Sequence, residues 1–485
     1  MVCPVMTLPR AEWADQQRAT VAVLRERVAV LETENEALRA KIDRLQARIR
    51  VLLARVEELR RAGKRQAAPF SKDKRNANPK RPGRKPGGAY GRHARRPVPN
   101  RVDRVVGVPL PSRCPHCGGE VIFERLACQH QEDLPPPQST QITRYELEIG
   151  RCRNCRRRIQ PRHPEQTSDA LGAAGVQIGP RAVALAAWLS KGLGLPAAKV
   201  ARVLGQSGLS VTPGGVIRAL ARAARRATPT WDALVGGVKA SPVVAPDETG
   251  WRVGGGKAWL WAFVGHRVIV YRIAHGRGFD DAAAVLGEGY AGVLERDGWA
   301  PYRRFTNATH QSCLAHLLRR CLQLIDDAER GQAKTPHAIR RILQGALAVR
   351  DARTAGELDS DQAATQAEQF GVAVDKLICG RTAYPPNRRL LRHLATERDA
   401  LFTFLFHDGV QATNWRAEQA IRPAVVTRKT WGGNRTWTGA GTWQVLASVT
   451  ATVQDRDPVG LLIGLLRAPG PVLADLAIPT TARGP

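Results

Sequence analysis

The sequence predicts a multidomain α+β protein, and three observations support this fold class. Leucine recurs at every seventh residue through the first sixty positions, which is typical of a coiled coil. Two Cys-x-x-Cys pairs follow, and beyond residue 240 the apolar pattern changes from helical spacing to the short runs and alternation of strands. At 485 residues the chain is long enough for several domains, each with a core of its own.

The formal net charge of +31 predicts a polyanion as partner. An anionic membrane surface is the competing interpretation, but no apolar stretch reaches the roughly 18 residues that a span requires. The first residues, Met1–Val5, lead into charged positions without the apolar segment of a signal peptide. We therefore expect no membrane association and a cytoplasmic, nucleoid-associated protein.

A leucine zipper is predicted at the N-terminus. The d positions are Leu24, Leu31, Leu38, Leu45, Leu52 and Leu59, and the a positions are Val21, Val28, Asn35, Ile42, Ile49 and Val56. β-branched a residues with leucine at d favour a parallel two-stranded coiled coil, and Asn35 can fix its register. The alternative is an amphipathic helix packed on its own protein, which six unbroken heptads disfavour. We expect a homodimer, with higher assemblies left open.

A basic linker follows the zipper. Residues 60–104 are rich in Lys and Arg and contain only Asp73 and Asp103 as acids. Proline and glycine around Arg84 and Lys85 exclude a stable helix. The segment could lie along phosphates, or place these two cations in an A·T minor groove, or serve as a solvated tether. In each case we expect it to be disordered without DNA.

The two Cys-x-x-Cys pairs predict a zinc ribbon. The expected ligands of a structural Zn²⁺ are Cys114, Cys117, Cys152 and Cys155. Between the pairs, Gln141–Ile149 alternates like a strand. Cys128 and His130 are weaker candidates for the same ion. Arg156 and Arg157 beside the second pair are expected to contact DNA phosphates.

The stretch from Pro180 to Arg226 is helical in pattern, with a glycine turn at Gly192–Gly194 and a capping start at Thr212-Pro213. Short helices separated by glycine turns suit a helix-turn-helix, whose last helix would enter the major groove. A plain helical connector is the alternative. We expect a helical, DNA-binding segment here.

Beyond residue 240 the sequence predicts a sheet. We expect a buried strand over Val243–Ala245, a hairpin of 258–264 with 268–273, a helix from about Asp280 to Leu286, and a strand that ends at Asp297. Three antiparallel strands, a helix and a parallel strand describe a ribonuclease H-like sheet. In that topology the first and fourth strands present Asp247 and Asp297 at neighbouring carboxyl ends. The Trp259–Trp261 pair is expected to serve packing.

Glu418 lies on a predicted helix far downstream. Ile421, three residues later, is expected to anchor that helix to the sheet so that the carboxylate points toward the aspartates. Asn414 either caps the helix or assists at a metal edge. Three carboxylates held by a sheet and a helix can clamp two divalent cations around a phosphodiester. The expected cofactors are therefore two Mg²⁺ or Mn²⁺ ions.

Two further groups lie near these carboxylates in the sequence. His310, Cys313 and His316 are three apart, but three such side chains on one helix cannot face one ion well. We expect Cys313 and His316 to pack between a helix and the core near the active site. Downstream of Glu418, the expected DNA contacts are Arg428, Lys429, Asn434 and Arg435, with a Gly432-Gly433 turn that lets the backbone approach DNA.

The chain resembles the transposases of the insertion-sequence 66 family over nearly its whole length. The motifs that carry the resemblance are Pro246–Thr249, Arg296–Trp299, Cys313–Arg320, Pro386–Leu391 and Asn414 through Arg435. The resemblance implies that Asp247, Asp297 and Glu418 form the metal-binding triad of a DDE transposase, and that residues 326–400 are a helical insertion. Two positions depart from the family pattern, Gly250 before Trp251 and Trp299 in place of tyrosine.

The predicted function is a DNA transposase that binds element ends and catalyses metal-dependent strand cleavage and strand transfer. Its partners are double-stranded DNA, as element ends and target, and a second copy of the chain; accessory transposition proteins are left open. The alternatives are a two-metal structure-specific endonuclease and a zipper-dimerised DNA-binding regulator without catalysis. A basic RNA-binding scaffold is disfavoured by the scarcity of aromatic residues, at 5%.

These predictions divide the chain into eight regions. We expect the coiled coil over 1–62, the basic linker over 63–105, the zinc ribbon over 106–165, the helix-turn-helix-like segment over 170–230, the first part of the catalytic core over 240–325, the helical insertion over 326–400, the second part of the core over 401–455 and a C-terminal tail over 456–485.

Overall fold

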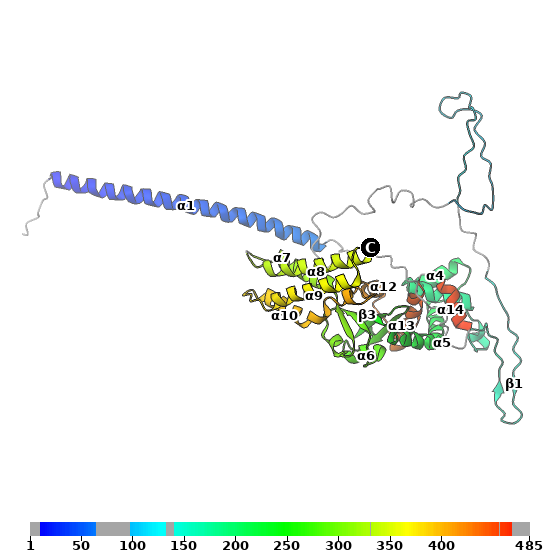
Figure 1. Ribbon diagram of the computed structural model, residues 1–485. Coiled ribbons are helices and arrows are strands. Elements are labelled where there is room, and N and C mark those ends of the chain that lie inside the picture. Colours follow the sequence, from blue (N-terminus) through cyan, green and yellow to red (C-terminus); the bar gives the residue numbers. More distant parts are fainter. Residues whose placement is uncertain (1–9, 65–97, 132–139, 330, 455, 468–485) are drawn as a thin grey trace, which may run out of the picture. The chain divides into compact units, whose positions relative to one another are not determined.

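The computed structural model describes residues 10–64, 98–131, 140–329, 331–454 and 456–467, and the chain divides into two compact units, Met1–Glu132 and Asp133–Pro485 (Figure 1). Helices and strands both occur in the second unit, which confirms the mixed α+β fold class. Among the described residues, no helix is both long enough and apolar enough to cross a membrane.

A long helix, α1 (Arg10–Lys64), occupies most of the first unit and covers the predicted zipper. Its repeating apolar residues face solvent, since Leu31, Leu38 and Leu45 are 48%, 58% and 52% exposed. An apolar seam of this length is costly to leave in water. The helix is therefore confirmed, while its pairing with a second copy stays a prediction.

Between α1 and the helices, the described residues 98–131 and 140–171 have little regular structure. The predicted linker, with Arg84 and Lys85, lies largely outside the described residues. In the second unit β1 (Gly150–Arg151) and β2 (Arg158–Ile159) pair antiparallel. The strand predicted over Gln141–Ile149 is wrong: these residues have no strand partner in the described parts, and alternation alone cannot form a strand without one.

Helices follow this hairpin. They are η1 (Gly172–Gly175), α3 (Pro180–Ala187), the π-helical η2 (Trp188–Gly192), α4 (Ala197–Gln206) and α5 (Pro213–Lys239). α5 begins at the predicted Thr212-Pro213 cap, because the Thr212 hydroxyl accepts the N–H of Gly215 at 3.1 Å. Its buried residues belong to the same hydrophobic core as the sheet. The last helix of the predicted helix-turn-helix is thus joined to the main body of the second unit.

Five strands form the central sheet in the order β5-β4-β3-β6-β7. They are β3 (Val243–Val253), β4 (Gly256–Val264), β5 (Ile269–Ala274), β6 (Val293–Arg296) and β7 (Thr309–Ser312). β3, β4 and β5 are antiparallel, whereas β6 runs parallel to β3 and β7 parallel to β6. α6 (Phe279–Leu286) connects β5 with β6, at the predicted helix. The three antiparallel strands, the helix and the parallel strand β6 are thus those that the sequence predicted, and β7 is a further strand that it did not predict.

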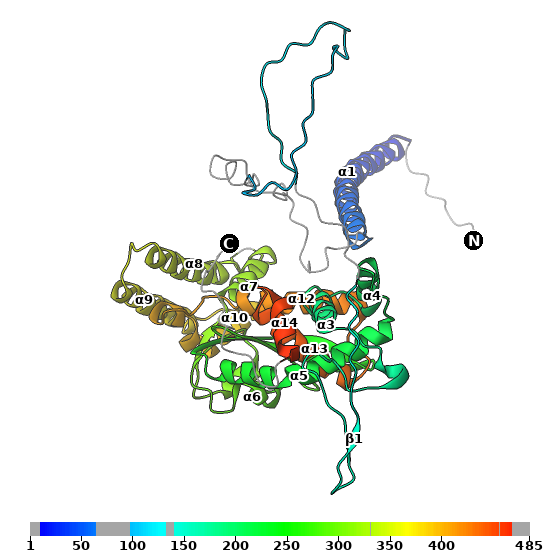
Figure 2. The ribbon, with the colours of Figure 1, turned by 90° about the vertical axis from the view of Figure 1, so that its right-hand side faces the viewer.

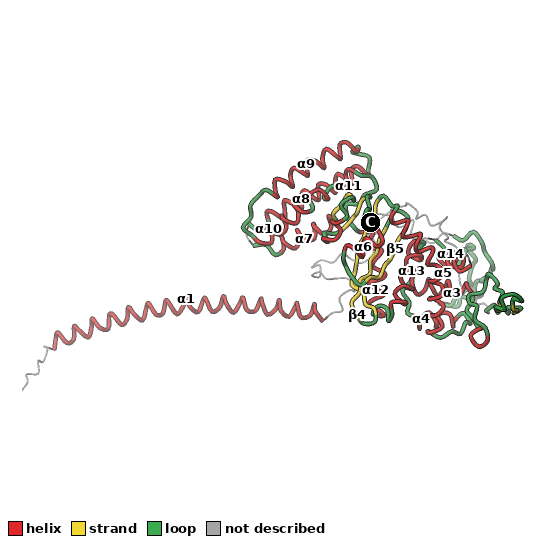
Figure 3. The backbone as a smooth tube through the Cα atoms, turned by 90° about the horizontal axis from the view of Figure 1, so that it is seen from below, coloured by secondary structure: helices red, strands yellow, loops and turns green. Residues whose placement is uncertain are grey.

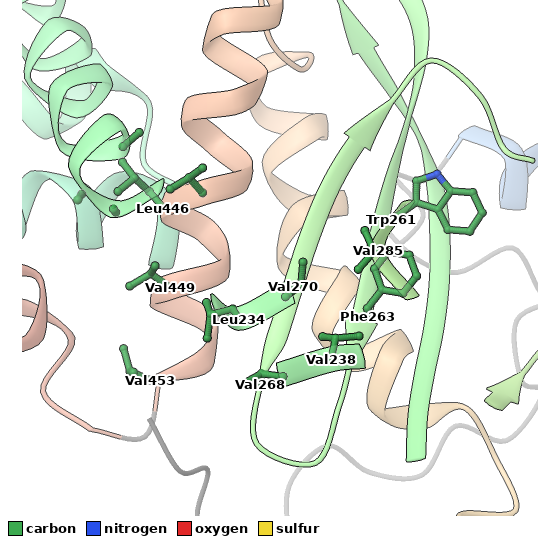
Figure 4. Packing of buried hydrophobic residues seen from close by; sticks show 14 of the residues in the cluster. Leu234, Val238, Trp261, Phe263, Val268, Val270, Val285, Leu446, Val449 and Val453 are labelled. Carbon is green, nitrogen blue, oxygen red and sulfur yellow. The ribbon is translucent and has the colours of Figure 1, made fainter. Parts of the chain in front are cut away.

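Both faces of the sheet are covered, because alternate residues of a strand point to opposite faces. On one face Trp261 and Phe263 pack with residues of α5 and α6 (Figure 4). On the other, Leu260 and Ala262 pack against α12 (Trp415–Trp431). Trp261 therefore has the packing role expected of it.

α13 (Trp437–Thr452) covers the β5 edge of the sheet. Three of its polar side chains accept outward N–H groups of that strand: Thr452 from Ile269 at 3.1 Å, Ser448 from Tyr271 at 2.8 Å and Gln444 from Ile273 at 3.1 Å. An edge strand left open would pair with other chains. These bonds close the edge and fix α13 in register with it.

A helical insertion interrupts the sheet-bearing part of the chain. It comprises α7 (Leu314–Asp326), α8 (Lys334–Thr354), α9 (Ser360–Ile378), α10 (Pro385–Thr396), η4 (Arg398–Ala400) and α11 (Thr403–Phe406). Its apolar residues form a hydrophobic cluster of their own that also takes in Val293 of β6. Figure 2 shows α7–α10 gathered together, and in Figure 3 the sheet lies between them and the helices α3, α5 and α14.

The described part of the predicted C-terminal tail, 456–485, contains a helix. α14 (Pro458–Arg467) buries Leu462, Leu465 and Leu466 against the main core, because leucines three and four apart share one helix face. Residues 468–485 lie outside the described part of the chain.

Candidate active site

Asp247 and Asp297 lie within electrostatic reach of each other, because each follows the paired part of two neighbouring parallel strands. β3 and β6 pair at Val243 with Val293 and at Val244 with Leu294, and each aspartate comes three positions after the second pair. β3 itself runs on to Val253 by pairing with β4. Asp247 is therefore inside a strand, just beyond the parallel pairing, whereas the sequence predicted it at a strand end.

Each aspartate is oriented by its own backbone. Oδ1 of Asp247 accepts the N–H of Glu248 at 2.9 Å, and Oδ1 of Asp297 accepts the N–H of Trp299 at 2.9 Å. The second of these bonds closes a small turn (residues 297–299) directly after β6. Both carboxylates are thus held before any ligand binds.

α12 brings Glu418 to the same end of the sheet. Asn414, at the N-terminus of α12, donates from Nδ2 to the carbonyl of Pro246 at 2.8 Å, one residue before Asp247. Glu418 lies one turn further on, and its N–H donates to the Asn414 carbonyl at 3.1 Å. Ile421 is 6% exposed and packs against the sheet, as its spacing predicted.

The three carboxylates influence one another electrostatically. Burial, together with the negative charges of Glu248, Asp297 and Glu418, raises the pKa of Asp247 to about 7, although the Glu248 N–H lowers it. A carboxyl group with this pKa lies in an environment that lacks positive charge. The structure therefore brings the predicted triad within electrostatic reach around Asp247.

These residues fit a hard divalent cation in their chemistry. In the parts of the chain that the structure describes, no three His, Cys, Asp or Glu side chains are yet close enough together to hold a metal ion. A cation would relieve the repulsion at Asp247, and Oδ1 of Asn414 is buried without a hydrogen-bond partner. The Asn414 amide cannot be flipped, because its Nδ2 must face the Pro246 carbonyl. Oxygen donors of this kind suit Mg²⁺ or Mn²⁺.

Asn414 and Cys313 share a buried contact beside the site. The Asn414 side chain makes no capping bond to α12, so the cap is the wrong one of the two roles left open by the sequence. The backbone N–H of Asn414 donates to Sγ of Cys313 at 3.2 Å. Cys313 is 2% exposed and has the packing role expected of it.

His316 is placed differently from the prediction. Its side chain is 42% exposed, and its Nε2 lies 3.7 Å from Oε1 of Glu418. A hydrogen bond with Cys313 and then the charge of Glu418 raise its pKa, against the effect of burial. Its assignment to packing is wrong, since the imidazole faces the carboxylates. His310 is on β7 with other partners, so the three residues do not form a zinc site.

Glu248 is a buried acid that the sequence reasoning missed. Its Oε1 accepts Nε of Arg277 at 2.7 Å and its Oε2 accepts the Tyr302 hydroxyl at 2.5 Å. The Arg277 guanidinium lies over the Trp299 ring, 3.9 Å from its centroid. The only signal in the sequence was a second acid beside Asp247, and nothing local shows that Arg277 and Tyr302 reach it.

Two of the predicted DNA contacts are used within the protein. The Arg428 guanidinium donates to the Gly250 carbonyl and to Oγ1 of Thr249. Oδ1 of Asn434 accepts Nε1–H of Trp251 at 2.9 Å, and its Nδ2 donates to the Gly439 carbonyl at 3.2 Å. Both side chains fix the far half of β3. Lys429 and Arg435 are exposed, and their contact with DNA stays a prediction.

The Gly432-Gly433 turn also serves the fold. Gly432 and Gly433 have φ of 78° and 111°, which favours glycine. A Cβ at Gly433 would lie 2.3 Å from the carbonyl oxygen of Arg252. The turn thus approaches the backbone of β3, whereas the sequence analysis expected it to approach DNA.

The two Cys-x-x-Cys pairs have the same local geometry, although they lie in different units. The N–H of Gly118 donates to the Cys114 carbonyl at 2.8 Å, and the N–H of Arg156 to the Cys152 carbonyl at 2.9 Å. Both donors have a positive φ, 77° and 56°. Backbone N–H groups lower the pKa of Cys114 and of Cys152. The N–H of His116 has the largest effect on Cys114, and the N–H of Cys155 has the largest effect on Cys152. Each pair is therefore suited to thiolate ligands, while the four-cysteine zinc site stays a prediction.

Comparison with known proteins places this site in a family. The family model described as Transposase IS66 family matches residues 175–442, a span that contains all three carboxylates and the insertion. The uncharacterized protein y4qI of Sinorhizobium fredii is 26% identical over an alignment that covers 38% of this chain and 40% of that protein. The chain thus spans less than half of this relative's length.

Proposed function

The chain belongs to the IS66 family of transposases, and on that premise we propose that it is a DDE-type DNA strand transferase that cleaves the ends of an insertion sequence and joins them to target DNA. One observation carries the proposal. Asp247 and Asp297 each come three positions after the last parallel pair of β3 and β6, and Asn414, at the start of the helix of Glu418, bonds the carbonyl of Pro246.

The three carboxylates would hold Mg²⁺ or Mn²⁺ in this proposal. Such ions would supply Lewis-acid activation of the attacking oxygen, which belongs to water when the element end is nicked and to the freed 3′-hydroxyl when it is joined to target DNA. Asn414 keeps α12 on β3, and His316 is near enough to Glu418 to orient its carboxylate or to donate a hydrogen bond to a phosphate.

The rest of the chain would serve DNA binding and assembly. The four cysteines of the two pairs would hold a structural Zn²⁺, with Arg156 and Arg157 exposed beside it. α1 would pair with its copy through the exposed leucine seam and bring two element ends together. Lys429 and Arg435, and the linker residues Arg84 and Lys85, would contact the double-stranded DNA.

The test is a nicking assay on DNA that carries the element end, with Mg²⁺. Asp247→Ala should bind this DNA as the wild type does and leave it uncut. Asp280→Ala, at an exposed position of α6, is the matched control and should cut normally. Nicking retained in Asp247→Ala would remove Asp247 from the site.

A pre-nicked element end separates the alternatives. A strand transferase joins its free 3′-hydroxyl to target DNA, whereas a structure-specific endonuclease gives no joined product. A DNA-binding regulator without catalysis would bind the end and neither cut nor join it.

A further inference from the structure

We propose that Glu397, at the end of the helical insertion, is a positioning residue for Asp297 that acts through Arg296 and Arg303. The proposal rests on the proposed function, because it concerns the turn at residues 297–299 that carries a metal-binding carboxylate. It gives the insertion a part in building the site.

Glu397 lies in a buried cluster of charges. Its side chain is 0% exposed, and that of Arg296 is 2% exposed. Oε2 of Glu397 is 2.6 Å from Nη1 of Arg296, and Oε1 is 3.1 Å from Nη1 of Arg303. One carboxylate therefore binds two arginines, each through a different oxygen, across about a hundred positions of sequence.

Both arginines hold the turn that carries Asp297. Nη1 of Arg296 donates to the carbonyl of Asp297 at 3.0 Å, and Nη1 of Arg303 donates to the carbonyl of Gly298 at 3.3 Å. Two successive peptide carbonyls of this turn are thus bound by guanidinium groups that share the Glu397 carboxylate. The turn is closed from inside by the bond from the Trp299 N–H to the Asp297 carboxylate.

His310 fixes the remaining direction of Arg296. Its Nε2 lies 3.1 Å from the carbonyl of Phe305, which can only accept, so Nε2 carries the proton. In a neutral ring Nδ1 is then a bare acceptor, and it takes Nε of Arg296 at 3.1 Å. The Arg296 guanidinium is thus fixed through Nε by His310 and through Nη1 by Glu397, so it cannot move with the turn at residues 297–299.

The insertion also contacts the turn directly. A Cβ at Gly298 would lie 2.6 Å from Cε1 of His393, on α10. The turn is therefore enclosed by the insertion on one side and by Arg296 and Arg303 on the other.

A buried ion pair of this kind is not explained by stability. Burying the charges has a desolvation cost that often equals their attraction, and apolar residues of similar volume can replace such a pair without loss of stability. What apolar residues cannot do is donate hydrogen bonds to the carbonyls of Asp297 and Gly298. Residues that orient a metal ligand typically change metal affinity about 10- to 100-fold when they are replaced.

The test compares two double variants. Arg296→Met with Glu397→Leu removes the buried pair and keeps the volume apolar. Arg398→Met with Asp375→Leu removes the neighbouring pair of the same insertion, 2.6 Å long but 30% and 51% exposed, which does not reach Asp297. We expect both to unfold in urea near the wild-type midpoint. The first should bind Mn²⁺ about 10- to 100-fold more weakly in a titration, and the control should bind it as the wild type does.

Hydrogen exchange gives a readout that needs no metal. The amide of Trp299 donates to Asp297, so its protection should fall by a similar factor in the first variant and stay unchanged in the control. If the first variant does not fold, Glu397→Gln, which keeps the shape and loses the charge, is measured in the same way. Wild-type protection at Trp299 and wild-type Mn²⁺ affinity in either variant would overturn the positioning role. A wild-type protein that neither binds Mn²⁺ nor nicks DNA would instead end the proposed function, and the exchange of Trp299 would still decide this inference.

Discussion

Replacing Asp247 with Asn should stabilise the metal-free protein at high pH. The folded protein holds this carboxyl group with a pKa of about 7, because it is buried and faces other acids. An unfolded chain would hold it near 3.9. Above pH 7 the wild type must therefore keep a charge where the fold disfavours it, and an asparagine removes that charge without changing the shape of the side chain.

The magnitude follows from the difference of about three pKa units. The folded state binds the proton more tightly, so the free energy of unfolding falls as pH rises from about 4 to 7 and is constant above. The full effect is roughly 4 kcal/mol as an upper bound, and the part lost between pH 5 and pH 8 is roughly 2–3 kcal/mol. The Asn variant lacks this dependence, so its advantage over the wild type should grow by that amount between the two pH values.

Urea unfolding in EDTA at pH 5 and pH 8, followed by tryptophan fluorescence, measures the two free energies. Asp280→Asn, at an exposed position, is the control and should track the wild type at both values. Added Mn²⁺ should raise the stability of the wild type at pH 8 and leave the Asn variant unchanged. An Asn variant with the same advantage at pH 5 as at pH 8 would refute a burial-raised pKa at Asp247.

Four further predictions concern other parts of the chain. Cys114→Ser should remove the bound zinc measured by metal analysis, and an unchanged zinc content would exclude the ribbon. Leu31→Asp with Leu38→Asp, at exposed positions of α1, should convert a dimer to a monomer in light scattering; a dimer that persists would place the contact elsewhere. Arg428→Ala should lower the free energy of unfolding by about 1–3 kcal/mol, because it leaves the Gly250 carbonyl and the Thr249 hydroxyl of β3 without this donor. Arg435→Ala should leave stability unchanged and reduce the salt dependence of DNA binding by about one phosphate contact, and equal salt slopes would remove it from the DNA surface.

The sheet could be predicted where its strands are apolar and could not where they are polar. The hairpin of β4 and β5 follows from the two apolar runs of 258–264 and 268–273 with a turn between them, and the helix before β6 from its spacing. β7 is Thr-His-Gln-Ser, without an apolar residue. Gln311 is 1% exposed there because its amide bonds the carbonyls of Ser312 and Leu401 and the N–H of Phe404. Partners so far away in sequence leave no local pattern.

The candidate site likewise contains residues that could be predicted from the sequence and residues that could not. The neighbourhood of Asp247 and Asp297 was predictable because parallel strands deliver their carboxyl ends to one place. Glu397 was not, because a buried carboxylate is indistinguishable in sequence from a solvated one until its arginines are known. Asn414 was assigned two roles from its position, and only the contact with Pro246 decides between them.

The hydrogen bond between Asn414 and Pro246 links positions 168 apart. A ribosome releases the chain from its N-terminus, so α1, both cysteine pairs and the aspartates leave it long before α12 does. On the proposed function, a growing chain gains its grip on DNA well ahead of its ability to cut, which protects the chromosome during synthesis.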